Sequence, residues 1–242
     1  MALQWTTTAH SAASNGVKML VHAESGSGKT MLCATAPQPV IISAESGLLS
    51  LNRANIERVF GPNRPDITYD IPTLPISTYP QLEEAYNFFA SGAARGHCKT
   101  ICLDSISEVA EKILQTFKQT KNDARQAYGE MADRTFELLK KFRDLAGYHV
   151  YMAAKQELWK DDSGISRFTV SMPGKQLGPQ MPYLFDEVFH LGIMRLQDGR
   201  KVRYLRTDQD TQYVAKDRSG RLDEIEEPNL TKIITKIQGV AA

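Results

Sequence analysis

Residues 17–30, V-K-M-L-V-H-A-E-S-G-S-G-K-T, place a lysine and a threonine directly behind a short glycine-containing turn. Glycines let the chain curl so that backbone N–H groups point at phosphate oxygens, and a helix opening at Lys29 adds its positive end. Lys29 would reach the β- and γ-phosphates of ATP, and the Thr30 hydroxyl would hold Mg²⁺. The segment therefore predicts a phosphate-binding loop made of Glu24, Ser25, Gly26, Ser27, Gly28, Lys29 and Thr30.

This segment departs from the usual pattern G-x-x-x-x-G-K-[ST] at one position, where Ala23 replaces the first glycine. A methyl group is tolerable there if the residue keeps a negative φ. The alternative is a Gly/Ser loop before an ordinary helix. The apolar strand before the loop and the helix-forming run Met31–Ala36 after it favour the phosphate site.

A second candidate lies at Asp104, which closes the apolar strand Thr100–Asp104. A strand-final carboxylate that accompanies a phosphate loop orients Mg²⁺, usually through a water. Many phosphate-loop ATPases carry a glutamate directly after this aspartate to activate water, but here the neighbour is Ser105. Glu45 is the natural candidate for the base and Glu108 the reserve, although Glu45 could equally be a solvated loop acid.

These residues require an α/β frame, in which buried strands carry them to one edge of a sheet. Strands are predicted before the loop and at 40–43, 100–104 and 148–154, with helices at 81–94, 107–117, 128–145 and 230–237. Residues 52–80, which contain five prolines, predict a peripheral insertion with one short strand near Ile76. Residues 184–194 return to the core, and 195–205 with 212–215 predict a hairpin joined through Gly199.

The composition of the chain limits the classes of function that it can have. The chain has 242 residues, of which 42% are hydrophobic and 24% charged, which is typical of a globular protein. A net charge of +1 leaves nucleic-acid contact to local basic patches. Cys33, Cys98 and Cys102 suit neither zinc nor disulfides. With no membrane-length apolar run, we expect a cytoplasmic protein with a lead-in at 1–16 and one domain at 17–242.

Two segments carry a family resemblance. T-I-C-L-D-S-I-S-E-V, residues 100–109, resembles the strand of RecA recombinases that runs Asp-Ser into a helix, and V-I-I-S-A-E-S, residues 40–46, is similar to their second strand. As a whole the chain most resembles phage RecA-like ATPases of the Sak single-strand annealing group, AAA-type nucleotide-binding proteins. This implies a RecA-like P-loop NTPase core: a mainly parallel twisted sheet with helices on both faces and antiparallel strands near the C-terminus.

The resemblance also implies roles for residues. Glu45 would be the water-activating glutamate, and Gln156 would sense the γ-phosphate, although the adjacent Lys155 is an open alternative. Lys216 and Arg218 would reach the γ-phosphate of a neighbouring subunit, which requires a homo-oligomer, either a filament or a ring; the alternative is that they lie in a solvated turn. The expected activity is an ATPase that binds single-stranded DNA and promotes annealing in phage recombination, in the host cytoplasm, with a single-strand-binding protein as a further candidate partner.

The DNA-facing residues are expected after the strand 148–154. Basic and aromatic side chains alternate there, and such residues track phosphates and stack on bases: Trp159, Lys160, Arg167, Phe168 and Lys175. The structural alternative is a β-hairpin turned at Ser163-Gly164, with Trp159 and Phe168 packed across the strands. The charges Lys140, Lys141 and Arg143 are expected mainly to be solvated.

Two other functions use the same loop. A small-molecule or nucleoside kinase would carry a mobile arginine-rich lid, and no convincing lid is present in the sequence. A nucleotide switch would bind ATP without productive turnover and would not assemble on DNA.

Overall fold

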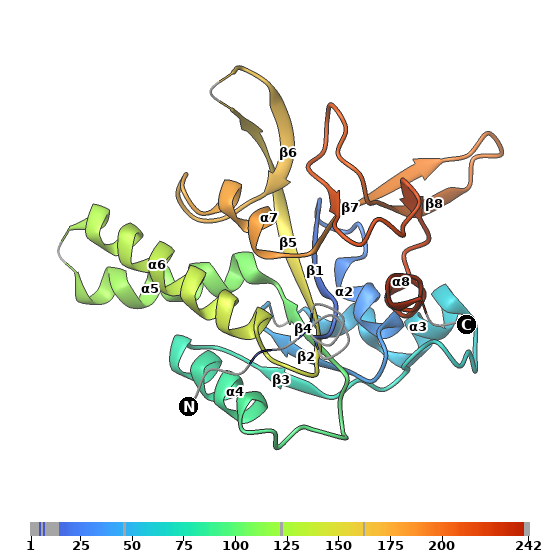
Figure 1. Cartoon of the computed structure of the whole chain (residues 1–242), viewed down its shortest axis with the longest axis horizontal. Coiled ribbons are helices and arrows are strands. Elements are labelled where there is room, and N and C mark those ends of the chain that lie inside the picture. Colours follow the sequence, from blue (N-terminus) through green and yellow to red (C-terminus); the bar gives the residue numbers. More distant parts are fainter. Residues whose placement is uncertain are drawn as a thin grey trace.

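A ten-stranded sheet forms the centre of the computed structural model, which describes residues 5, 7, 15–45, 47–121, 123–161 and 163–239 (Figure 1). Its strand order is β10-β8-β7-β1-β5-β4-β2-β3. β1 (Lys18–Ala23), β2 (Pro39–Ser43), β3 (Thr73–Pro75), β4 (Thr100–Asp104), β5 (His149–Lys160) and β7 (Glu187–Arg195) run parallel. β8 (Lys201–Arg206), β9 (Lys216–Asp217) and β10 (Ile225–Glu226) add antiparallel pairs, and β6 (Ser166–Val170) pairs with β5.

Alternating side chains of the central strands divide the core into two layers. On β1, Leu20 packs with α4 (Tyr79–Ala90), α5 (Ile106–Thr120) and α6 (Ala124–Arg143). Met19 and Val21 point to the other face, toward α2 (Lys29–Leu32), η1 (Cys33–Thr35) and α8 (Leu230–Gln238). A strand covered on both faces must be apolar throughout, which explains the continuous apolar runs in the sequence. The expected fold class, a mainly parallel sheet with helices on both faces and antiparallel strands near the C-terminus, is confirmed.

The prediction for residues 52–80 was wrong in part. α3 (Arg53–Phe60) is a helix, capped by Asn52, whose side chain accepts a hydrogen bond from the backbone N–H of Asn55. The helix has only eight residues, and Ile56 is the one that is buried. The short strand lies at β3 and pairs with β2 as an edge of the main sheet, after η2 (Leu48–Leu51) and α3 have intervened.

The C-terminal part differs from the predicted hairpin in its last segment. β7 and β8 form a hairpin with Gly199 at its turn, where the φ of Gly199 is 84°. Residues 212–215 do not continue this hairpin. They lie against β6, where the Phe168 N–H donates to Gln212 O at 2.6 Å and the Val214 N–H donates to Phe168 O at 3.0 Å. η3 (Gly178–Gln180) and α7 (Met181–Leu184) connect β6 to β7.

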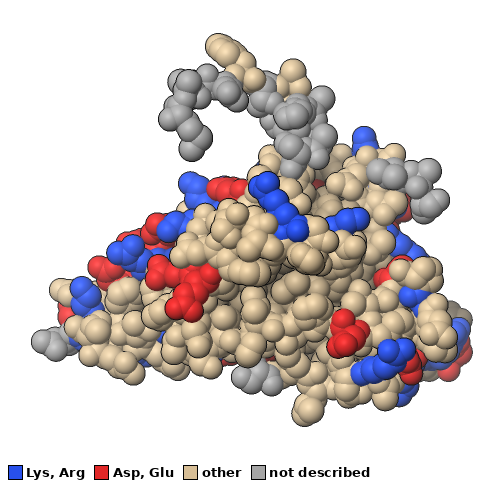
Figure 2. All heavy atoms as spheres, turned by 90° about the horizontal axis from the view of Figure 1, so that it is seen from below, with Lys and Arg blue, Asp and Glu red and all other residues tan. Residues whose placement is uncertain are grey.

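Charges of both signs are interspersed on the face in Figure 2, at the edges of a broad area of other residues. This agrees with the net charge of +1, so a polyanion would need a local site. Within the described residues, no helix combines the length and apolarity that crossing a bilayer requires.

Candidate functional site

The loop between β1 and α2 has the backbone of an anion-binding turn. Gly26 and Gly28 have φ angles of 75° and 111°, a region that favours glycine. The turn is closed by the Ser27 hydroxyl, which donates to Glu24 O at 2.8 Å. Among the described residues, no protein acceptor receives the N–H of Gly26 or Gly28. These free donors at the start of a helix fit the phosphates of a nucleotide.

Ala23 fits its position. It is the last residue of β1, is buried, and is not one of the described non-glycine residues with positive φ. An alanine methyl is therefore accommodated where the usual pattern has glycine, as the sequence predicted.

Lys29 bends back over the loop that it follows. Its Nζ donates to Ala23 O at 3.0 Å and to Glu24 O at 2.9 Å. Burial lowers the pKa of Lys29, while Asp104 and Glu45 raise it. The ammonium is thus held by carbonyls on the same loop whose N–H groups are free, beside the two carboxylates of the site.

Thr30 and Asp104 meet although 74 positions separate them. The Thr30 hydroxyl donates to Asp104 Oδ2 at 2.6 Å. Burial raises the pKa of Asp104 to about 6, and the nearby Glu45 adds to this, while the hydrogen bond from Thr30 opposes it. One carboxylate and one hydroxyl are a partial oxygen ligand set, which suits Mg²⁺ because this ion takes its other ligands from phosphates and water. No cluster of three or more His, Cys, Asp or Glu side chains suited to a metal occurs in the described part of the chain.

Glu45 reaches the same site from the end of β2. Its Oε1 accepts a hydrogen bond of 2.5 Å from the Ser105 hydroxyl, which follows Asp104 in the chain. Glu45 is exposed and lines a cavity of about 360 Å³ together with Gly26, Gly28, Lys29 and Thr30. The serine that replaces the expected glutamate therefore holds the candidate base in place. The reserve candidate, Glu108, forms an ion pair with Lys155.

Further residues that line this cavity were not predicted from the sequence. α3 contributes Asn55, Arg58, Val59 and Phe60, and Leu191, Arg203 and Pro228 come from the C-terminal part. Arg203 touches the loop directly, because its Nε–H donates to Ser27 O at 2.7 Å. The Asn52 cap was a signal for α3 in the sequence, whereas nothing near Arg203 in the sequence indicates a contact 176 positions away.

Gln156 and Lys155 lie on β5, beyond the buried part of that strand. The Lys155 ammonium is exposed and paired with Glu108, while the Gln156 side chain is half-buried. Gln156 Oε1 is buried and has no hydrogen-bond partner among the described residues. Gln156 also lies near His22, since its side chain raises the pKa of that histidine. The structure thus separates the environments of these two candidates, and the sensing role stays a prediction.

Lys216 and Arg218 both have partners within the chain. Lys216 Nζ donates to Pro182 O at 2.8 Å and to Phe185 O at 2.5 Å, and burial lowers its pKa. Arg218 forms an exposed ion pair of 2.8 Å with Asp186. A role for these cations in a neighbouring subunit remains a prediction.

The β5–β6 hairpin contains four of the five residues predicted to contact DNA. Trp159 pairs with Arg167 and Leu158 with Phe168, so Trp159 and Phe168 point to opposite faces. The expected packing of Trp159 against Phe168 was therefore wrong. Trp159 and Arg167 line a cavity of about 400 Å³ that also includes Tyr183 and Lys216, and Lys160 and Lys175 are exposed elsewhere.

The other face of this hairpin joins a series of aromatic contacts. Phe168 stacks on Tyr213 with ring centroids 5.5 Å apart, and Tyr213 stacks on His190 at 3.6 Å. His190 lies 5.5 Å from His22, which immediately precedes Ala23 and the loop. This series connects the hairpin to the strand from which the phosphate loop begins.

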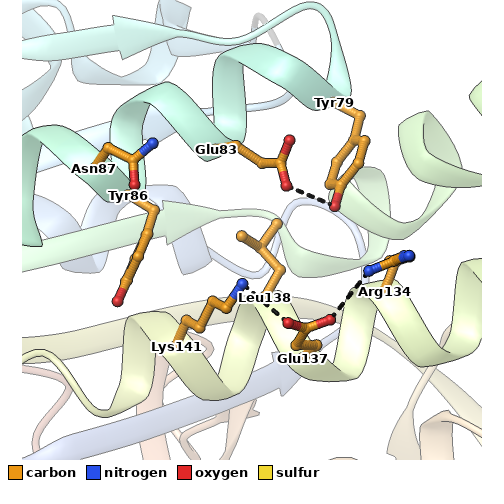
Figure 3. Close-up of a pocket in the computed structure, with 8 residues that line it drawn as sticks. All are labelled: Tyr79, Glu83, Tyr86, Asn87, Arg134, Glu137, Leu138 and Lys141. Atoms are coloured by element: carbon orange, nitrogen blue, oxygen red, sulfur yellow. Dashed lines mark hydrogen bonds and ion pairs between the residues drawn. The ribbon is translucent and has the colours of Figure 1, made fainter.

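A third hollow lies between α4 and α6, and Figure 3 shows that its charges face one another. The Tyr79 hydroxyl donates to Glu83 at 3.0 Å, and Lys141 pairs with Glu137 at 3.0 Å. Arg143 pairs with Asp144 at 2.7 Å. Lys140 and Lys141 are exposed, as expected of solvated charges. The expectation was wrong for Arg143, which is half-buried and also donates to Leu184 O at 3.2 Å.

Comparison with known proteins gives the family. No curated protein matches the chain. Among solved structures, a KaiC-like protein from the hyperthermophilic archaeon Pyrococcus horikoshii OT3 is similar at 15% identity over 84% of this chain and 83% of that chain, with a TM-score of 0.42. A family model described as an AAA domain matches residues 15–219. Because this match spans most of the chain and includes the phosphate loop, the chain belongs to the AAA domain family and is a P-loop NTPase.

Proposed function

We propose that the chain binds ATP with Mg²⁺ and hydrolyses the bond between its β- and γ-phosphates, with Glu45 polarising the attacking water. The observation that carries this proposal is that Thr30 and Glu45 line one cavity, while Asp104 is hydrogen-bonded to Thr30 and Ser105 to Glu45. Mg²⁺, held by Thr30 and Asp104, would neutralise developing charge on the phosphates. Lys29 and the free N–H groups of the loop would bind the phosphates, and Ser105 would keep the Glu45 carboxylate directed at the site.

Glu45 is favoured over Glu108 by its surroundings. A base needs a free carboxylate oxygen toward the water. Among the described residues, Glu45 accepts from the Ser105 hydroxyl alone, which leaves its other oxygen available. The Glu108 carboxylate is instead neutralised by the Lys155 ammonium. Glu45 is therefore the residue through which we expect hydrolysis to proceed.

We further propose that the chain acts on single-stranded DNA in annealing and recombination, as do the phage proteins that it resembles. The DNA would bind along the β5–β6 hairpin. Support comes from the cavity beside the hairpin, where Trp159 and Tyr183 offer aromatic rings and Arg167 a cation. Aromatic stacking on bases is sequence-tolerant, and cations track the phosphates. The ring series from Phe168 to His22 supplies a packed connection between this hairpin and the nucleotide loop.

Assembly into a homo-oligomer would use Arg218 more readily than Lys216. The exposed Arg218–Asp186 pair contributes about 0–1 kcal/mol, so exchanging Asp186 for a phosphate costs little. Lys216 would have to leave two carbonyl acceptors, each a charge-assisted bond of about 1.5–3 kcal/mol. We therefore expect Arg218 to be the cation that acts on a neighbouring subunit.

Phosphate release, measured with and without oligo(dT), tests the ATPase. Lys29→Ala is expected to lose ATP binding, and Glu45→Gln to retain binding and lose turnover. Glu83→Gln, which alters a carboxylate in the α4–α6 hollow, is the matched control and is expected to behave like wild type. Normal turnover in Glu45→Gln would remove this residue as the base.

Tryptophan fluorescence tests the DNA site, because Trp5 and Trp159 are the two tryptophans of the chain. In a Trp5→Phe background, stacking of a base on Trp159 is expected to quench emission as oligo(dT) is added. Arg167→Gln is expected to weaken this binding, and Lys99→Gln, outside the cavity, to leave it unchanged. If oligo(dT) neither quenches nor binds by anisotropy, with or without ATP, the DNA role fails while the ATPase proposal stands.

A further inference from the structure

Arg203 contacts the phosphate loop from a part of the chain that no sequence motif connects to it. It lies on β8, and its Nε–H donates to Ser27 O at 2.7 Å. A Cβ added to Gly28 would come within 3.0 Å of Arg203 Nε and 3.4 Å of its Cδ. The side chain therefore lies against the loop at the Ser27–Gly28 peptide, and it also lines the cavity of the site.

That peptide is the one whose orientation matters for phosphate binding. In a trans peptide the C=O and the following N–H point in opposite directions. When Arg203 holds the Ser27 carbonyl toward β8, it directs the Gly28 N–H to the other side of the loop. This N–H has no protein acceptor among the described residues, as expected for a donor kept for an anion.

Within the loop, the Ser27 hydroxyl bonds Glu24 O at 2.8 Å, but this bond holds the side chain and does not itself fix the Ser27–Gly28 peptide. Gly26 and Gly28, on either side of Ser27, have left-handed φ angles and the greatest backbone freedom of any residue type. The Ser27 N–H is 3.4 Å from Glu24 O, a long hydrogen bond. Ordering a glycine-flanked peptide costs conformational entropy on binding, and an external hydrogen bond that orders it beforehand lowers this cost.

Arg203 is well placed to supply such a bond because its own strand is anchored. Its neighbour Leu205 is fully buried in the core, and Leu191, opposite Leu205 on β7, is buried too. Arg203 lies on the same face of the hairpin as these two leucines, because Leu205 is two positions along β8 and Leu191 is two positions from Ile193, which pairs with Arg203. Its guanidinium has no carboxylate partner in the described parts of the chain, so no competing ion pair draws it from the loop.

We propose that Arg203 is a positioning residue of the nucleotide site, which pre-orders the Ser27–Gly28 peptide so that the Gly28 N–H faces the phosphates. This inference rests on the proposed binding of ATP. The N–H groups of a phosphate loop surround the phosphates that ATP and ADP share. A pre-ordered loop therefore favours ATP and ADP equally, whereas direct contact with the γ-phosphate would favour ATP alone.

The test is equilibrium titration of fluorescent N-methylanthraniloyl derivatives of ATP and ADP into wild type, Arg203→Met and Arg203→Lys. Arg203→Met keeps the apolar stem and removes every donor. We expect both nucleotides to bind roughly tenfold more weakly, because binding must then supply the cost of ordering about one residue of backbone. Arg203→Lys restores a donor and is expected to recover most of the affinity. Arg200→Met is the matched control, since Arg200 pairs with Asp198 near the hairpin turn.

Three results would overturn the proposal. Unchanged affinity in Arg203→Met would show that the bond has no role in binding, and a loss confined to ATP would indicate contact with the γ-phosphate instead. Equal losses in Arg203→Met and Arg203→Lys, with a matching fall in the unfolding midpoint without nucleotide, would indicate a purely structural residue. Failure of wild type to bind either nucleotide would refute the proposed function itself, which separates the two hypotheses.

Discussion

His22 predicts a specific loss of stability in mild acid. Its ring is fully buried, and its Nε2 lies 2.7 Å from Val214 O. A carbonyl only accepts, so Nε2 carries the proton of the neutral ring and a second proton must go to Nδ1. Nδ1 is buried without a partner among the described residues. Burial is the main cause that lowers the pKa of His22 to about 4; the Val214 carbonyl and Gln156 partly oppose it, and the Lys29 charge adds a smaller lowering effect.

The magnitude follows from the two states of the chain. A histidine in the unfolded chain has a pKa of about 6.5, so at pH 5 it is protonated there while the buried ring is still neutral. The unfolded state then binds more protons, and the folded state loses stability as the pH falls from about 6.5 toward 4. Above pH 6.5 both states are neutral and the difference vanishes. For a pKa of about 4, the loss at pH 5 is about 2 kcal/mol of unfolding free energy.

Urea unfolding at pH 7.5, 6 and 5 measures this loss in wild type and in His22→Gln. His22→Gln removes the titrating ring, so its unfolding free energy is expected to fall about 2 kcal/mol less than that of wild type between pH 7.5 and 5. His190 is also buried with a lowered pKa and remains in both proteins, as do the carboxylates. His97→Gln, at an exposed site, is the control and is expected to follow wild type. Parallel pH profiles for wild type and His22→Gln would refute the reasoning.

Three further substitutions have expected effects on stability, all measured by urea unfolding at pH 7.5. Tyr151→Phe removes a buried hydroxyl that donates to Lys29 O at 2.8 Å, and is expected to lower the unfolding free energy by about 1 kcal/mol. An unchanged unfolding free energy would show that this hydrogen bond is no stronger than the bonds to water that replace it on unfolding. Gly129→Ala, inside α6 with no atom within 4 Å of the added methyl, is expected to stabilise by about 0.5–1 kcal/mol. Gly192→Ala would place a methyl 2.3 Å from the Tyr204 ring, and is expected to destabilise by about 1–3 kcal/mol. If both glycine variants raised the unfolding free energy, or both lowered it, this account would be contradicted.

The central strands were predictable from sequence because they are buried on both faces. β2 and β4 are continuous apolar runs, and their predicted bounds, Val40–Ser43 and Thr100–Asp104, match the structure within one residue. α3 was missed because it has only eight residues and is followed by a proline-rich stretch, which favours a loop. Residues 212–215 were assigned to the wrong partner because β-branched and aromatic residues favour a strand-like conformation without naming the strand beside which it lies.

The nucleotide loop and Asp104 were predictable because their chemistry is encoded in contiguous residues. Thr30 and Asp104 are bonded at 2.6 Å, as expected for two groups that would share one ion. The contact of Glu45 with Ser105 follows from the order of strands, since β2 and β4 are neighbours and both end at the same edge. Arg203 could not be found in this way, because its place depends on the register of the β7–β8 hairpin.

The face of a side chain on the β5–β6 hairpin decides its chemistry. The sequence placed Trp159 and Phe168 in one group, because both are aromatic and lie among cations. The register separates them by pairing Phe168 with Leu158 rather than with Trp159. Phe168 consequently stacks on Tyr213, and His190 and His22 continue this series of ring contacts to β1. Trp159 is left beside a cavity, where a base could reach its ring. A one-residue shift of this register would pair Phe168 with Trp159 and place both rings on one face, so the chemistry that each face of the hairpin presents is set by its pairing as much as by its composition.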